Sequence, residues 1–291
     1  MRRLIGGGLA VCLFVLAFLA MSPSAHAQLP ASPRRFVDNL DERCYSITDP
    51  APGLSLRLDH LNPLFIQMHL PFENVTLQSP QQLCVPVKKN NIAPPSDTLP
   101  FIQLLDWKCY GISGTALNIP LTLTQLNPTI SGLLGSTVGV TVQEPQLLCV
   151  PVAKNNTTIP ANVLALIQYL DVKCYRVTST VNHSVPVTLT HLNPLFATLS
   201  PETSTIGPAP QQLCVPVTKN QAVVPTSVIQ FVEYSDTLCY PATGAPLGQN
   251  VTLRHLNPLL TTLPSENVFV GNSLKLCVPV AKNGMLPPGI Q

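Results

Sequence analysis

Apolar and polar residues alternate in short runs that recur along the chain. Leu54, Leu56 and Leu58 are separated by Ser55 and Arg57. The same alternation recurs at three later places: Ile119, Leu121 and Leu123; Val185, Val187 and Leu189; Val251 and Leu253. A period of two predicts a strand with one face towards the core and one towards water. Each run ends at Leu-Asn-Pro, where Asn favours a turn and Pro keeps the residue before it out of the helical region.

A second alternating strand follows in three of the repeating stretches, beginning nine residues before the cysteine of Leu-Cys-Val-Pro-Val. Its apolar positions are Val75 and Leu77, Val140 and Val142, and Val268 and Val270. The peptide Leu-Cys-Val-Pro-Val that follows is also typical of a strand. Because its proline has no N–H to donate to a ladder, we expect this peptide at a sheet edge or a bulge.

A short apolar stretch precedes each Cys-Tyr pair. Val163, Leu166, Ile167 and Leu170 fit one face of a two-turn helix, and Pro160 stands where a helix would begin. An extended segment is the competing interpretation.

Four peptides recur in fixed order, which predicts a repeat architecture. Leu-Cys-Val-Pro-Val occupies 83–87, 148–152, 213–217 and 276–280, and a Lys-Asn pair follows at 89–90, 154–155, 219–220 and 282–283. Cys-Tyr occurs at 44–45, 109–110, 174–175 and 239–240. The copies span 33–91, 97–156, 160–221 and 225–283, named copies 1 to 4 below. We therefore expect a mainly β fold: a tandem array of four small disulfide-stapled β modules, each with a short helix if the helical interpretation holds.

The first 27 residues have the layout of a cleaved signal peptide. Arg2 and Arg3 precede an apolar run over 4–21, and Ala25-His26-Ala27 offers small residues to a signal peptidase before Gln28. A membrane anchor is the alternative for the apolar run. The sequence thus predicts secretion, to the extracellular space or a periplasm.

Charge excludes one class of partner. Without Arg2 and Arg3, the 16 Lys and Arg fall to 14, equal to the 14 Asp and Glu. Nucleic-acid binding requires clustered basic side chains, and none is present. No later stretch is apolar for long enough to span a membrane. The 31 prolines also argue against long helices.

Eight cysteines remain after the signal segment, two in each copy. Repetition leaves two arrangements, within a copy or between neighbouring copies. Because pairing between copies would strand Cys44 and Cys277 at the two ends of an array, we expect bonds within copies. The expected disulfides are Cys44–Cys84, Cys109–Cys149, Cys174–Cys214 and Cys239–Cys277.

No repeated group points to catalysis, a cofactor or a metal. His60, His191 and His255 share one repeat position, but copy 2 has Gln125 there, so we expect a hydrogen-bonding side chain at a turn. We expect each recurring lysine at a solvated strand end, with the asparagine after it in a left-handed turn. We expect each recurring tyrosine in a module core with its hydroxyl bonded to backbone. The acidic residues suggest no repeated position. The sequence contains no Cys-x-x-Cys, nucleophile or phosphate-loop motif.

The Cys-Tyr start and the Leu-Cys-Val-Pro-Val-x-Lys-Asn ending resemble an uncharacterised repeat domain of secreted bacterial proteins. The resemblance covers residues 40–283 and implies a bacterial exported protein, with no activity or catalytic residue to carry over. Leu238 departs from the Lys or Arg that precedes Cys-Tyr in the other copies. We expect a secreted, non-enzymatic interaction or structural protein that meets a protein or glycan at the cell surface. The alternative is a secreted inhibitor of a protease or other enzyme, presenting a rigid loop such as 65–72 or 129–135.

Overall fold

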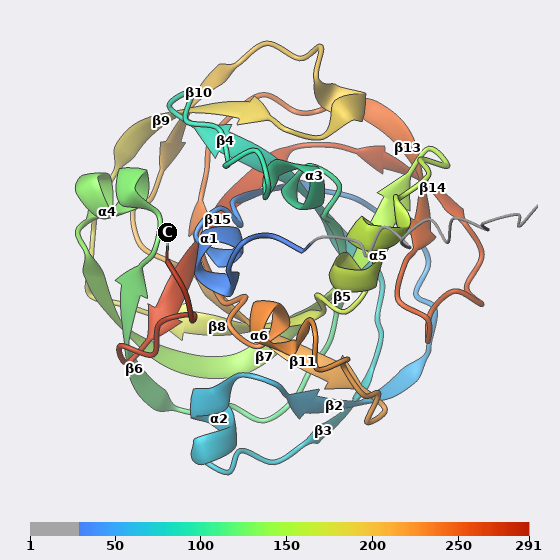
Figure 1. Cartoon of the computed structure of the whole chain (residues 1–291), viewed down its shortest axis with the longest axis horizontal. Helices are drawn as coiled ribbons and strands as arrows, with labels where there is room; N and C mark the ends of the chain where they lie inside the picture. The colour runs from blue at the N-terminus through green and yellow to red at the C-terminus, as the bar shows by residue number, and fades with distance from the viewer. Residues whose placement is uncertain (1–28, 291) are drawn as a thin grey trace, which may run out of the picture.

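The computed structural model describes residues 29–290; the expected signal peptide lies outside them. Eight antiparallel strands pair in a closed ring, because the last of them, β15, pairs with the first, β1. In order around the ring the strands are β1 (Glu42–Ser46), β4 (Pro80–Lys89), β5 (Asp106–Gly111), β7 (Thr137–Lys154), β8 (Val172–Thr178), β11 (Gln212–Lys219), β12 (Thr237–Pro241) and β15 (Ser273–Lys282). Each copy contributes two neighbouring strands to this barrel, which surrounds the centre of the view in Figure 1.

The alternating segments form hairpins outside the barrel. They are β2 (Ser55–His60) with β3 (Glu73–Thr76), β6 (Ile119–Gln125) with the start of β7, β9 (Val185–His191) with β10 (Glu202–Ile206), and β13 (Gln249–His255) with β14 (Glu266–Val270). Each hairpin pairs with the end of a barrel strand two copies away: β2 with β11, β6 with β15, β9 with β4, and β13 with β7. The mainly β class is confirmed, but the copies interlock in one barrel instead of standing as separate units along an array.

The prolines of Leu-Cys-Val-Pro-Val do not lie at a sheet edge, contrary to expectation. Pro86 is the last β4 residue paired with β1, and Val87 is the first residue paired with β9. The strand therefore changes partner at the residue that has no N–H to donate. The carbonyl of Pro86 still accepts a hydrogen bond, from the Leu192 N–H of copy 3 at 2.9 Å.

A short helix precedes the first barrel strand of every copy, which confirms the helical interpretation. These helices are α1 (Pro33–Val37), α3 (Leu99–Ile102), α5 (Ala161–Ile167) and α6 (Ile229–Val232). They gather near the centre of the view in Figure 1, over the barrel. Phe36, Phe101, Leu166 and Val232 from these helices pack in the same core cluster as the eight cysteines. The helices thus close the apolar interior at this end.

The Leu-Asn-Pro segments also begin helices, in three copies. These are α2 (Pro63–Gln67), α4 (Pro128–Leu134) and the 3-10 helix η1 (Pro194–Phe196), at the periphery of Figure 1. In α2, the Asn62 side chain accepts a hydrogen bond from the Leu64 N–H at 3.0 Å, and Pro63 takes the first helical position. An Asn N-cap followed by Pro is a helix-start signal that the turn prediction overlooked.

The register of the strands explains why the barrel closes. Within copy 1, Cys44 lies opposite Cys84, whereas between copies 1 and 2 Cys84 lies opposite Trp107, two residues before Cys109. The same offset recurs at the other three junctions between copies. A constant stagger tilts the strands, as closure of a barrel requires.

The two ends of the described part, residues 29–290, meet beside α1. The Arg34 N–H donates to the Pro288 carbonyl at 2.9 Å, and the Ser32 hydroxyl donates to the Ile290 carbonyl at 2.6 Å. Among residues 29–290, no helix is both long and apolar enough to cross a membrane.

Candidate functional site

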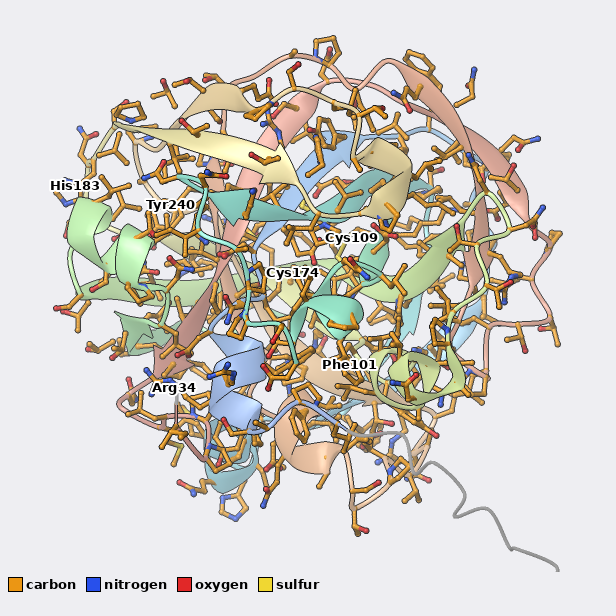
Figure 2. The ribbon with its side chains drawn as sticks, turned by 45° about the horizontal axis from the view of Figure 1, so that its top comes forward. Arg34, Phe101, Cys109, Cys174, His183 and Tyr240 are labelled. Carbon is orange, nitrogen blue, oxygen red and sulfur yellow. A yellow bond between two sulfur atoms is a disulfide. The ribbon has the colours of Figure 1, made fainter. Side chains whose placement is uncertain are left out.

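The eight cysteines form a continuous belt inside the barrel, one on each barrel strand. Disulfides join Cys44–Cys84, Cys109–Cys149, Cys174–Cys214 and Cys239–Cys277. Sulfurs of neighbouring disulfides lie 3.8–3.9 Å apart at all four junctions between copies. Cys109 and Cys174 appear near the middle of the molecule in Figure 2.

One step in the expectation for the disulfides was wrong. Cys44 and Cys277 would not be stranded by pairing between copies, because their sulfurs lie 3.9 Å apart where the barrel closes. The argument by elimination assumed an open array. In the closed barrel every sulfur has a neighbour on each side. Pairing within copies and pairing between copies therefore differ only in which of the two neighbours each sulfur bonds.

The recurring lysines are buried in ion pairs and are not solvated strand ends. They are Lys89 with Asp41, Lys154 with Asp106, Lys219 with Asp171, and Lys282 with Asp236, each pair within one copy. These aspartates stand three residues before the first cysteine of every copy, so the acids do share a repeated position, contrary to expectation. Burial lowers the pKa of each lysine and raises the pKa of each aspartate, with Asp236 reaching about 6.

Each of these aspartates also binds the Asn of a Leu-Asn-Pro triplet from a neighbouring copy. Asn193 of copy 3 donates to Asp106 of copy 2 at 2.9 Å. The equivalent bonds are Asn62 to Asp236, Asn127 to Asp41, and Asn257 to Asp171. The bond from Asn62 to Asp236 joins copy 1 to copy 4. The four Asn–Asp bonds therefore link the copies in a complete ring, as the barrel strands do.

The asparagines of the Lys-Asn pairs connect copies two apart. Asn90 takes a φ of 46°, the left-handed turn expected from the sequence. Its side-chain oxygen accepts from the Thr188 N–H of copy 3 at 3.0 Å, and its own N–H donates to the Thr188 carbonyl at 2.8 Å. Asn155, Asn220 and Asn283 make the same two contacts with Thr252, Arg57 and Thr122.

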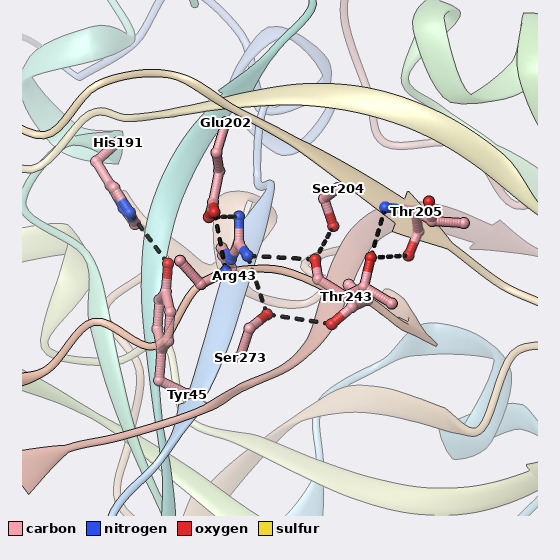
Figure 3. A network of polar contacts seen from close by, with 10 residues as sticks. Arg43, Tyr45, His191, Glu202, Ser204, Thr205, Thr243 and Ser273 are labelled. Carbon is pink, nitrogen blue, oxygen red and sulfur yellow. Dashed lines mark hydrogen bonds and ion pairs between the residues drawn. The ribbon is translucent and has the colours of Figure 1, made fainter.

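The recurring tyrosines and histidines are partners of each other. The hydroxyl of Tyr45 in copy 1 lies 3.1 Å from Nε2 of His191 in copy 3 (Figure 3). The equivalent pairs are Tyr110 with His255, Tyr175 with His60, and Tyr240 with Gln125. The hydroxyls therefore bond side chains of another copy, where we expected backbone partners. Burial lowers the pKa of His191 to about 4, so its ring is neutral at pH 7.

Basic residues just before the first cysteines make a further set of contacts across the barrel. Arg43 of copy 1 pairs with Glu202 of copy 3, and its guanidinium also donates to the Ser273 hydroxyl at 3.0 Å and the Thr243 carbonyl at 3.4 Å (Figure 3). Lys108 pairs with Glu266, and Lys173 pairs with Glu73 at 2.6 Å. Glu73, Glu202 and Glu266 thus share a second repeated acidic position, which the sequence prediction missed.

The exceptions to the repeat fall on one interface. Copy 4 has Leu238 where the others have Arg43, Lys108 and Lys173, and copy 2 has Val138 where the others have Glu73, Glu202 and Glu266. Leu238 and Val138 belong to one apolar cluster. Gln125, which replaces a histidine, meets Tyr240 at this same interface at 2.8 Å. An apolar pair therefore stands where the other interfaces have an ion pair.

The residues that recur in the copies thus contact one another, either within a copy or between copies. Among residues 29–290, no group of three or more His, Cys, Asp or Glu side chains is arranged to hold a metal ion.

A hollow on the surface lies over the hairpin of copy 2. This groove has a volume of about 700 Å³ and is lined by β6, β7, residues 178–180 and Asn283. Its floor includes Gly139, and no atom lies within 4 Å of the position that a Cβ would take there. The lining side chains carry no charge. We take this groove as the candidate functional site.

Comparison of the chain with models of protein families, with curated proteins and with solved structures found no significant match in any of the three.

Proposed function

We propose that this chain is a secreted, non-enzymatic protein that binds a partner outside the cytoplasm, with the closed barrel serving as a rigid scaffold. Four disulfides support an oxidising destination, where such bonds form and persist. The resemblance to a repeat domain of exported bacterial proteins also supports secretion, and it implies a bacterial source.

One observation carries the proposal: the titratable residues that recur in the copies are engaged in contacts between or within copies. Lys154 is paired with Asp106, and Tyr110 is bonded to His255. A catalytic group must reach a substrate, whereas these side chains are buried in the scaffold. Surface residues that differ between copies are left to recognise a partner.

Binding can be tested with the secreted protein in its oxidised form, labelled at its amino terminus. Immobilised oligosaccharides, purified envelope polymers and cell-surface proteins would be offered, with the reduced and alkylated chain as the control. We expect saturable binding that is lost on reduction. Absence of binding to every immobilised class would contradict the proposal, and so would release of a cleaved product detected by mass spectrometry.

A second candidate function is inhibition of an enzyme, favoured by one loop of copy 1. Ile66 in the last turn of α2 is 55% exposed, and Met68 and Phe72 in the segment after it are 39% and 48% exposed. His69 between them has a φ of 54°, a strained backbone conformation for a residue other than glycine. A rigid exposed loop of this kind suits a protease inhibitor. Inhibition by the intact protein at one-to-one stoichiometry, abolished by Phe72→Ala together with Met68→Ala, would support this function over a purely adhesive one.

A further inference from the structure

The groove exists because copy 2 departs from the repeat at one cross-strand pair. Arg57 lies opposite Asn74 in copy 1, and Thr188 lies opposite Thr203 in copy 3. In copy 2, Thr122 lies opposite Gly139. In copies 1 and 3, both members of this cross-strand pair thus carry a side chain. In copy 2 one of the two side chains is missing, and the space above it is open.

Copy 4 shows what the missing side chain would do. There, Thr252 lies opposite Asn267, and its hydroxyl donates a hydrogen bond to the Asn267 amide oxygen. Thr122 occupies the position of Thr252 but faces a glycine. Its hydroxyl is therefore left without the partner that copy 4 provides.

A second departure builds the wall of the groove. In copy 2 the hairpin strand and the barrel strand are one element, because β7 runs without a break over 18 residues. In the other copies they are separate strands. The longer strand pairs with β8 through Thr141 and Thr178. The Ser179 hydroxyl then donates to the Gly139 carbonyl at 2.7 Å, which holds residues 178–180 against the hairpin.

The chemistry of the groove is that of free hydroxyls. Within the part of the chain that the structure describes, the side chains of Thr122, Thr141, Thr178 and Thr180 line the groove and make no hydrogen bond. A hydroxyl can both donate and accept, and so can the hydroxyls of a sugar. An ion would find no opposite charge among the lining residues. The exposed ring of Pro120 offers an apolar surface to the C–H face of a sugar ring.

We propose that this groove binds a short neutral oligosaccharide, held by the threonine hydroxyls over the floor left open at Gly139. The proposal rests on the binding function proposed above and names its ligand class and its place. The volume of about 700 Å³ lies within the usual range for small-ligand sites.

The test fills the floor of the groove with the residue that copies 1 and 4 carry at this position. Gly139→Asn introduces that side chain at a position whose φ is not left-handed and whose neighbours leave it room. Gly132→Asn is the matched control, because Gly132 is an exposed glycine of the same copy, also with open space around it, outside the groove. Maltohexaose, cellohexaose and chitohexaose would be titrated into the full oxidised protein by calorimetry and by ligand-observed NMR.

We expect at least one hexasaccharide to bind at one site per chain. Gly139→Asn should weaken that binding by about tenfold or more, and Gly132→Asn should leave it unchanged. Equal binding by Gly139→Asn, or no binding of any of the three sugars to the unmodified protein, would overturn the proposal. If the protein instead binds a charged polymer or a protein, the assignment of the groove fails while the broader binding function stands. If it binds none of these classes, both fail.

Discussion

The interface between the hairpin of copy 2 and the barrel strands of copy 4, where Val138 and Leu238 lie, offers a direct test of how the hairpins are seated. Leu238 is fully buried and Val138 is 4% exposed, and they occupy the positions that hold Lys173 and Glu73 elsewhere. If the four interfaces share one geometry, an ion pair can be built at this one. The perturbation is Leu238→Lys and Val138→Glu, made singly and together.

Each single substitution would bury one charge with no partner. A buried charge without its partner costs about 3–5 kcal/mol of stability. In the double variant, the two new side chains should meet as Lys173 and Glu73 do, so the loss should be smaller than the sum by about 2–3 kcal/mol, a coupling typical of residues in contact. The reciprocal control is Lys173→Leu with Glu73→Val, which should be close to neutral or stabilising, because a buried ion pair is often replaced by apolar residues at no cost.

The free energy of unfolding would be measured for all variants by urea titration followed by fluorescence, with the disulfides intact. Losses that add to within about 0.5 kcal/mol would show that the two positions do not touch, and would refute the shared geometry of the interfaces.

Acid sensitivity should decrease when His191 is replaced by glutamine, which already serves at the equivalent position of copy 2. Because burial lowers the pKa of His191 from 6.5 to about 4, the unfolded chain takes up the proton first and stability falls as pH drops through that interval; a His191→Gln urea midpoint that declines as steeply as the unmodified one from pH 7 to 4 would contradict this. Replacing Cys44 by serine frees the Cys84 thiol, which lies 3.9 Å from the sulfur of the next disulfide, so exchange at alkaline pH should spread the free thiol along the belt. Alkylation and peptide mapping should then label Cys84, Cys149, Cys214 and Cys277, and labelling confined to Cys84 would rule out exchange. A circular permutant of residues 29–290 that joins Ile290 to Leu29 and opens within residues 92–95 should fold with nearly unchanged stability; loss of the folded state would contradict the closure of the barrel at β1 and β15.

Local features of the fold could be predicted from the sequence because they depend on neighbouring residues. The alternation at Leu54, Leu56 and Leu58 reports a strand with one buried face, and that strand is present as β2. The left-handed Asn90 and the helix over Ala161–Ile167 were likewise visible in local patterns.

The connections between copies could not be predicted in the same way. A repeated sequence contains the same residues whether its copies form an open array or a closed ring, so nothing local to Tyr45 indicates that its partner is His191, 146 residues away. Two signals were nevertheless present. Asp41 and its three equivalents recur before the first cysteines, and the exceptions Leu238 and Val138 replace a basic and an acidic residue together.

Small-angle X-ray scattering of the secreted, oxidised protein tests the closed barrel most directly. A compact unit of this length should have a radius of gyration of about 18 Å, whereas four separate modules in a line should give about 30 Å. We predict the smaller value, with a distance distribution of a single compact body. A value near the larger one would contradict the closure of the four copies into one barrel.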